Sequence, residues 1–481
     1  MDQIPASDAV TEITPPSAAG PIPLERIDAD AVKVLQRLRK QGFEAYLVGG
    51  CVRDLLLGLK PKDFDVATNA RPRQIKRLFR NSRIIGRRFK LVHVTFGPKI
   101  IEVSTFRGPP AASGDSSENG EPGELESSDS LSADLLILRD NAFGTLEEDA
   151  QRRDFTINAL FYDVDGQRVL DSVGGQADLE RRVVRTIGDP QRRVREDPVR
   201  ILRAVKFATR LRFSIDAELF AAMREYHADI ARAAPPRVIE EILRILGSGS
   251  AAEAMALLHE LEVLTVLFPE LGVVLDTAEQ REENRRLFLR ALEALDRLDR
   301  GQRGFSNAVF LGTLFALPVL TQIAQLQQSQ SRRDPGLLVD EILRPFARHT
   351  RLARRDLSRM KSMYLAQRRF EQADSRRRRG TRLGDLVRRD YFDDAFTLFR
   401  ILSLAHGQGE RVTRWEERLR DVPRPVAGAL PSRRRKHRRR RSARRPEAPT
   451  SGSPAMAADT DGDNWEIGST GEQHEPAPPA M

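Results

Sequence analysis

Residues 45–68 read AYLVGGCVRDLLLGLKPKDFDVAT, and this stretch decides how the first part of the chain is expected to fold. The apolar run AYLV predicts a buried strand, and the pattern after the two glycines predicts a short helix that begins near Val52. Gly49 and Gly50 then form a turn at a helix N-terminus, where exposed N–H groups attract phosphate oxygens and Arg53 adds a charged donor. For the glycines alone, the alternative is a tight strand–helix connection without a ligand.

Two carboxylates, Asp63 and Asp65, follow this helix and flank Phe64. Residues two apart on a strand point to the same face, so we expect the carboxylates to converge while Phe64 turns inward. Such anions repel each other unless cations lie between them, and oxygen ligands suit Mg²⁺, which also binds substrate phosphates. Two such ions would stabilise the attacking and leaving oxygens of a phosphoryl displacement. A solvated turn is the alternative for an isolated pair, but the upstream glycine turn favours a metal site.

A third carboxylate usually accompanies such a pair, and the sequence offers two candidates. The alternation of IIEVSTF places Glu102 and Ser104 on one strand face. Asp154 follows Arg153 where a charged cluster enters the apolar run FTINAL. A charged cluster at the edge of a core segment is either a satisfied ion pair or part of a site, and both readings stay open.

The stretch REDPVRILRAVKFA, residues 195–208, predicts a helix with Asp197, Arg200 and Arg203 near one face. Glu196 can reach Arg200 at the i+4 position, so an ordinary surface salt bridge is one interpretation. The other is base recognition, because an Asp can accept from an exocyclic amino group while an Arg donates to the adjacent ring nitrogen. That pair would select adenine or cytosine without separating them.

In this order, LVGGCVRDLLLG, KDFDVAT, RRDFTINAL and EDPVRILRAVKFA resemble the class II nucleotidyltransferases, which comprise bacterial poly(A) polymerases and tRNA CCA-adding enzymes. The stretch IIGRRFKLVHVTFG at 84–97 and the arginine-rich end are similar to the poly(A) polymerase branch, since CCA-adding enzymes usually carry a Phe-Gly-Thr/Ser type sequence there. No His is followed by Asp, so an appended HD phosphohydrolase domain is not expected. The departures are Cys51, where a third small residue is common, and the acidic segments at 109–134 and after 446.

The resemblance implies template-independent polyadenylation of RNA 3′ ends, with AMP transferred from ATP, pyrophosphate released and Mg²⁺ as the cofactor. A tRNA CCA-adding activity is the alternative, and a non-catalytic RNA-binding protein is the second. By match to the family motifs and by position, Asp63 and Asp65 are the expected metal ligands. The expected catalytic residues are Asp63, Asp65, Asp154 and Glu102, and the expected nucleotide-binding residues are Gly49, Gly50, Arg53, Arg153, Asp197, Arg200 and Arg203.

Short β-type runs end near residue 172, and helical spacing dominates after about residue 190. We therefore predict an α+β protein: a nucleotidyltransferase head with a small mixed sheet, followed by an all-helical region. The expected divisions are a disordered N-terminus (1–23), the head (24–172) with a disordered insert (109–134), a helical neck (173–270), a helical body (271–425) and a disordered arginine-rich, then acidic tail (426–481).

The charge distribution indicates a polyanionic partner. Residues 433–445 hold ten Lys and Arg and no acid, whereas 109–134 and 446–481 each hold seven acids and no base. With a net charge of +10 overall, the remaining chain is strongly basic in its own right. RNA is expected to be gripped by its backbone through a set of arginines and one lysine: Arg376, Arg377, Arg378, Arg379, Arg433, Arg434, Arg435 and Lys436.

Other features bear on the compartment. Cys51 is the only cysteine, which excludes an internal disulfide. The N-terminus lacks the pattern of a signal peptide, and VFLGTLFALPVL at 309–320 is too short to span a bilayer. We expect a cytoplasmic protein without stable membrane insertion, although the 433–445 tract could alternatively touch an anionic membrane surface. Protein partners in RNA decay are left unknown by the sequence.

Overall fold

The computed structural model describes residues 21–86, 90–108, 143–277, 279–299, 304–329, 332–374 and 381–420. All of these belong to one unit, Met1–Pro425. The predictions for the N-terminus up to residue 20, for the insert 109–134 and for the tail 426–481 lie outside the described residues. The same holds for the proposed RNA-binding residues at 376–379 and 433–436.

A seven-stranded mixed sheet forms the N-terminal part, in the order β3-β4-β5-β2-β1-β6-β7. Only β2 and β5 pair in parallel within this sheet; the other neighbours are antiparallel. Its strands are β1 (Ala45–Val48), β2 (Asp65–Thr68), β3 (Ser82–Ile85), β4 (Leu91–Phe96), β5 (Lys99–Thr105), β6 (Phe161–Asp163) and β7 (Arg168–Leu170). The sheet confirms the predicted α+β class with a mixed-sheet head.

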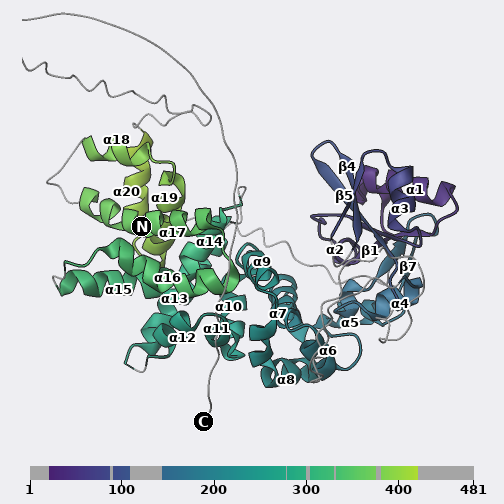
Figure 1. Cartoon of the computed structure of the whole chain (residues 1–481), viewed down its shortest axis with the longest axis horizontal. Helices are drawn as coiled ribbons and strands as arrows, with labels where there is room; N and C mark the ends of the chain where they lie inside the picture. Colours follow the sequence, from purple (N-terminus) through teal and green to yellow (C-terminus); the bar gives the residue numbers. More distant parts are fainter. Residues whose placement is uncertain are drawn as a thin grey trace, which may run out of the picture. The chain divides into compact units, whose positions relative to one another are not determined.

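The two faces of this sheet differ because successive strand residues point to opposite sides. α1 (Ala29–Lys40) and α3 (Pro72–Leu78) pack on one face, where Leu47, Val66 and Val103 are buried in the main core (Figure 1). The other face holds a small apolar cluster around Phe106 and Phe161. The helices on the remaining sides are α2 (Gly50–Leu56), α4 (Leu146–Gln151) and α5 (Gly175–Arg181).

A narrow stem follows β5 at the edge of the insert. Arg107 and Phe143 form an isolated antiparallel bridge, and the Gly144 amide donates to the Phe106 carbonyl at 3.1 Å. A Cβ atom on Gly144 would lie 2.5 Å from the Gly108 Cα, so the two strands of the stem approach closely only because glycine occupies the position.

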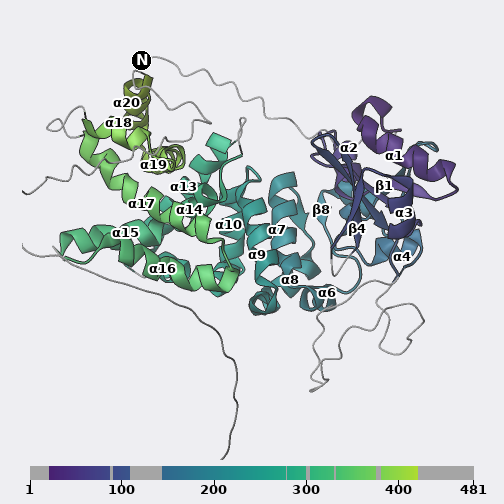
Figure 2. The ribbon, with the colours of Figure 1, turned by 45° about the horizontal axis from the view of Figure 1, so that its top comes forward.

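Helices make up nearly all of the described chain after the head, apart from the short pair β8 (Val183–Val184) and β9 (Ser214–Ile215) (Figure 1). The first group is α6 (Pro190–Glu196), α7 (Val199–Leu211), α8 (Ala217–Glu225), α9 (Pro235–Leu246), α10 (Ala251–Glu260), α11 (Val263–Leu267) and α12 (Pro269–Asp276). Within it α7 packs against both α9 and α10 (Figure 2). The expected helix through Asp197 is broken there: the residue has non-helical φ and ψ of −149° and 88°, and Pro198 opens α7.

The second helical group buries an aromatic core that includes Trp415, Phe370 and Phe399. Its members are α13 (Arg281–Asp299), α14 (Asn307–Leu314), α15 (Ala316–Gln328), α16 (Pro335–Thr350), α17 (Arg354–Asp374), α18 (Thr381–Val387), α19 (Phe392–Ala405) and α20 (Gly409–Arg420). No single helix in the described ranges is long and apolar enough to cross a membrane. The α14–α15 pair passes by length and composition only when both are taken together, and it is bent by 64°.

Candidate active site

A cavity of about 220 Å³ opens on the sheet face opposite α1 and α3. Strands β1, β2, β4 and β5 form one wall, and the end of α4 with the residues after it forms another. The cavity is lined by Val48, Asp65, Leu91, Glu102, Ser104, Arg107, Asp149, Arg152 and Arg153. Carboxylates on the sheet therefore face Arg152 and Arg153, which follow the end of α4.

Asp65 and Glu102 are direct partners in the parallel β2–β5 pair. Glu102 and Ser104 line the same cavity, which confirms that they share a strand face. Burial, with the nearby negative charge of Glu102, raises the pKa of Asp65 to about 6; the positive charge of Arg153 offsets only part of this effect. Asp65 thus lies in an excess of negative charge that a cation would relieve.

Asp63 lies differently from the prediction. β2 begins at Asp65, so Asp63 precedes the strand, is exposed and does not line the cavity. Its charge still reaches Asp65, as the smallest contribution to the raised pKa of that carboxyl. Phe64 is partly buried against the main core, as expected.

Asp149 is a site residue that the sequence interpretation missed. Its buried carboxylate accepts from Arg153 Nε and Nη2 at 3.1 and 2.9 Å, from Arg152 Nε at 3.3 Å, and from the Arg107 backbone N–H at 3.2 Å. It therefore holds the cationic wall of the cavity. The i, i+3 and i, i+4 spacing from Asp149 to the two arginines was the available signal.

The glycine turn lies between two guanidinium groups. Gly49 has a φ of 79°, and a Cβ there would meet Arg153 Nη1 at 3.3 Å. α2 begins at Gly50, two residues before the expected start, and a Cβ on Gly50 would lie 3.6 Å from Arg53 Nη2. The turn thus needs glycine for its backbone conformation and for the approach of Arg153.

The structure does not place Arg53 in the cavity. Its side chain is buried, donates to Asp54 Oδ1 from Nε and Nη2 at 2.8 and 2.6 Å, and donates to Asn158 Oδ1 at 2.5 Å. The guanidinium also lies 5.0 Å from the centre of the Phe207 ring on α7. Arg53 therefore packs beside the glycine turn at Gly50 and contacts Phe207 on α7.

Asp154 is likewise separate from the cavity. It accepts from Arg203 Nε at 2.6 Å, from Asn158 Nδ2 at 3.2 Å, and from the Phe155 backbone N–H at 2.8 Å. Although burial opposes ionisation, Arg203 and these hydrogen bonds lower the pKa of Asp154 to about 2. Of the two candidates for a third carboxylate, only Glu102 lies beside Asp65.

The predicted base-selecting residues meet partners within the helical region. Arg237 on α9 donates to both carboxylate oxygens of Asp197, at 2.9 and 2.7 Å. Arg200 is buried and pairs with Glu196 at 3.5 Å, the expected i+4 contact, and burial lowers its pKa to about 10. Arg193 donates to the Arg152 carbonyl at 2.8 Å, so this segment contacts the chain that forms the cavity wall.

His93 is a second residue that the sequence interpretation missed. It stands opposite Glu102 in the β4–β5 register, with Nε2 3.2 Å from Glu102 Oε1. That nitrogen is buried and has no aligned hydrogen-bond partner in the described part of the chain. His93 thus limits the space available to the Glu102 carboxylate on the side away from Asp65.

The donor set fits partial coordination of a divalent cation. Across the described ranges, no three His, Cys, Asp or Glu side chains converge as a complete ligand set. Mg²⁺ is usually bound through one or two carboxylates together with substrate phosphates, so Asp65 with Glu102 or Asp63 meets that requirement. The pairing of Asp65 with Glu102 on adjacent strands in one cavity supports a cation there, and burial with the charge of Glu102 correspondingly raises the pKa of Asp65.

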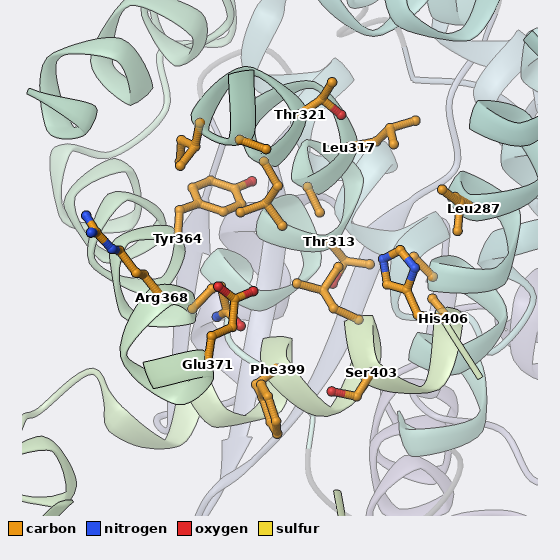
Figure 3. Close-up of a pocket in the computed structure, with 18 of the residues that line it drawn as sticks. Leu287, Thr313, Leu317, Thr321, Tyr364, Arg368, Glu371, Phe399, Ser403 and His406 are labelled. Atoms are coloured by element: carbon orange, nitrogen blue, oxygen red, sulfur yellow. The ribbon is translucent and has the colours of Figure 1, made fainter. Parts of the chain in front are cut away.

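A larger cavity, of about 510 Å³, lies among the C-terminal helices and differs in chemistry (Figure 3). Tyr364, Phe399 and Thr313 line it, and Tyr364 donates its hydroxyl to the Gly312 carbonyl at 2.8 Å. Glu371 is the one acidic residue among its described lining residues. It therefore lacks the paired carboxylates of the sheet cavity.

Comparison with known proteins identifies the family. A family model described as "Poly A polymerase head domain" matches residues 45–185, and one described as "Probable RNA and SrmB- binding site of polymerase A" matches residues 212–274. Poly(A) polymerase I of Salmonella typhi is 37% identical over 87% of this chain and 90% of its own length. The chain belongs to the poly(A) polymerase I family. It is accordingly a nucleotidyltransferase, and the predicted resemblance is confirmed.

Other relatives of this poly(A) polymerase I family member cover less of the chain and include the CCA-adding branch. Poly(A) polymerase I of Haemophilus influenzae is 36% identical over 70% of this chain and 73% of its own. The CCA-adding enzyme of Lactobacillus helveticus is 37% identical over 45% of this chain and 49% of its own. The solved CCA-adding enzyme of Bacillus stearothermophilus in complex with CTP shares the fold, with a TM-score of 0.56 at 24% identity over 81% of this chain and 82% of its own.

Proposed function

We propose that this protein extends RNA 3′ ends without a template, transferring AMP from ATP to the 3′-hydroxyl with release of pyrophosphate. The observation that carries the proposal is the sheet cavity, in which Asp65 and Glu102 face Arg152 and Arg153. Carboxylates for a cation beside arginines for phosphates are the groups that nucleotidyl transfer from a triphosphate requires. The family relationship to poly(A) polymerase I supports this reading.

Each wall of the cavity has a proposed role. Asp65 and Glu102, with the nearby exposed Asp63, would hold two Mg²⁺ ions, which when bound activate the 3′-hydroxyl and neutralise charge on the leaving pyrophosphate. Glu102 is proposed as the third carboxylate because Asp154 is engaged by Arg203. Asp154 would position the chain that carries Arg153.

The triphosphate is proposed to lie against Gly49, Gly50 and Arg153, with Arg152 and Arg107 beside them. Arg53 would act indirectly, through the glycine turn that it supports. For the adenine edge we propose Asp197 and Arg200, with Arg203 fixing Asp154 between head and helices. Asp197 retains acceptor capacity while Arg237 is bound, because two ionised carboxylate oxygens offer about four lone-pair sites.

Nucleotide choice tests the proposal. ATP and CTP are offered separately with an unstructured RNA and with a tRNA lacking its 3′ end. Long tails from ATP on both substrates are expected. Incorporation of CTP into the tRNA that stops after a few residues would instead establish the CCA-adding alternative, which the CCA-adding relatives make the second candidate.

A non-catalytic RNA-binding protein is the remaining alternative. A double substitution, Asp63→Ala with Asp65→Ala, is expected to abolish AMP incorporation while leaving RNA binding intact. Unchanged incorporation by this variant would refute the metal-site proposal.

A further inference from the structure

An arginine cluster surrounds the junction between α16 and α17. Four residues define it, all exposed: Arg344, Arg348, Arg351 and Arg354. Arg351 is the turn residue, with a φ of 52°, and Arg354 opens α17. Since a helix rises about 1.5 Å per residue, the part of the cluster from Arg344 to Arg351 spans roughly 10 Å.

None of the four has a side-chain partner among the residues that the structure describes. Two neighbouring acids are engaged elsewhere: Asp340 with Lys361 and Glu341 with Arg333, each at 2.5 Å. A third, Asp356, lies in the first turn of α17 beside Arg354, so the four arginines keep a net positive charge. Other arginines of this helical group do form ion pairs, such as Arg400 with Glu416 at 3.2 Å. The cluster is therefore an unneutralised cationic surface.

Folding does not explain this arrangement. Like charges within a Debye length of about 8 Å at physiological salt repel one another. Arg354, with Arg355 beside it, lies in the first turn of α17, where the helix dipole disfavours cations. Arg348 near the end of α16 and Asp356 in the first turn of α17 are compatible with the dipole, whereas Arg354 is not, so four arginines without an ion pair fit an external anion better than a role in folding.

The helix that carries Arg344 and Arg348 packs against the region matched by the RNA-binding family model. α16 packs against α9, and α9 lies inside the matched residues 212–274. Arginine binds phosphate bidentately through its planar guanidinium. Phe346, within this stretch, is buried in the core, so its ring is not available for stacking a base.

We propose that the cluster formed by Arg344, Arg348, Arg351 and Arg354 binds the phosphate backbone of single-stranded RNA, next to the region that the RNA-binding family model matches. Contact through phosphates alone is independent of sequence, so the surface accepts the original RNA and the added tail equally. The proposal rests on the proposed function only in taking RNA as the substrate.

The test measures the salt dependence of RNA binding without nucleotide, on the full chain. All four arginines are replaced by glutamine (Arg344→Gln, Arg348→Gln, Arg351→Gln, Arg354→Gln), which removes charge and keeps a non-glycine residue at position 351. The control removes four exposed arginines of α13 (Arg281→Gln, Arg286→Gln, Arg290→Gln, Arg297→Gln). Thermal unfolding of both variants checks the fold.

With a long unstructured RNA, the slope of log K against log[salt] should fall by about 3 in the cluster variant, since each single-strand phosphate contact contributes about 0.7. The control should keep the wild-type slope. An unchanged slope in the cluster variant overturns the proposal. So does unchanged RNA binding with lost binding to vesicles of phosphatidylglycerol and phosphatidylcholine, which would assign the surface to a membrane. Because no nucleotide is added, the result is independent of whether ATP or CTP proves to be the substrate.

Discussion

Asp65 and Asp154 are both largely buried aspartates of the head, yet their environments are opposite. Burial and the charge of Glu102 raise the pKa of Asp65 to about 6, whereas Arg203 and hydrogen bonds overcome burial and lower the pKa of Asp154 to about 2. Asp154 has every acceptor engaged within the chain, and Asp65 has neighbours of its own sign. Asp154 therefore stabilises the fold, whereas Asp65 is available to bind an external cation.

The largest expected effect on activity follows from removing Asp65, the carboxylate that is available to an external cation. Asp65→Asn should lower the rate of AMP incorporation by about a thousandfold, the upper range for losing one preorganised electrostatic group. The measurement is single-turnover extension of a labelled RNA at saturating Mg²⁺. Ser104→Ala, in the same cavity, is the control and should retain most of the rate. Equal rates for wild type and Asp65→Asn would show that Asp65 has no role in catalysis.

Removing Asp154, the carboxylate engaged within the chain, should act mainly on stability. Asp154→Asn removes the closer carboxylate partner of Arg203, which keeps Glu241 at 3.4 Å, so the loss should lie below the about 3–5 kcal/mol that breaking a fully buried pair costs. Denaturant unfolding at neutral pH measures this loss. Asp165→Asn, which removes the exposed partner of Arg39, should cost no more than about 1 kcal/mol. A stable but inactive Asp154→Asn variant would show instead that Asp154 is a catalytic residue, as the sequence predicted.

His93, the neighbour of Glu102 on β4, offers a finer test of the proposed metal site. His93→Ala should lower the rate about tenfold, the lower range for losing an outer-shell partner of a ligand. His93→Gln, which keeps bulk and a polar atom near Glu102, should recover part of the rate. The Mg²⁺ concentration for half-maximal activity should rise in the alanine variant, and an unchanged value would show that His93 does not position Glu102.

Two glycines with similar backbones allow the turn to be tested against a matched control. Gly49 and Gly58 have φ values of 79° and 73°, but only at Gly49 would a Cβ meet a neighbour, Arg153. Each alanine variant should lose about 1–3 kcal/mol of stability, because a positive φ is strained for any residue with a side chain. Only Gly49→Ala should also raise the KM for ATP severalfold. An equal KM in both variants would show that the turn does not contact the nucleotide.

The smallest effects are opposite pH dependences. Without divalent cations, Asp65 should weaken folding as pH rises from about 4 to 6, because burial and Glu102 raise its folded pKa above the unfolded value. Asp154 should stabilise folding above about pH 4 and lose this contribution as pH falls toward 2, because Arg203 outweighs burial and lowers its pKa. Unfolding free energies of the two Asn variants relative to wild type, measured against pH, should therefore diverge. Mg²⁺ with ATP should remove the Asp65 effect.

The same contrast shows what sequence could reveal. Strand alternation correctly joined Glu102 to Ser104, and the family motifs led to Asp65 and the glycine turn. Local spacing could not show that Arg53 turns toward Asn158 or that Asp197 meets Arg237, because those partners come from distant elements. Asp63 was misplaced because the strand starts two residues later than the alternation assumed. His93 escaped because its significance depends on β4 pairing with β5.

The glycine-closed stem at Gly108 and Gly144 has a practical consequence for this family member. The chain leaves the sheet and returns to it at one point, so the length of residues 109–142 is decoupled from the geometry of the strands. Closing a longer connection adds only about 0.6 kcal/mol per doubling of its length. The stem is thus a site where the connection can be shortened, or a reporter domain inserted, without shifting the register that sets Asp65 opposite Glu102.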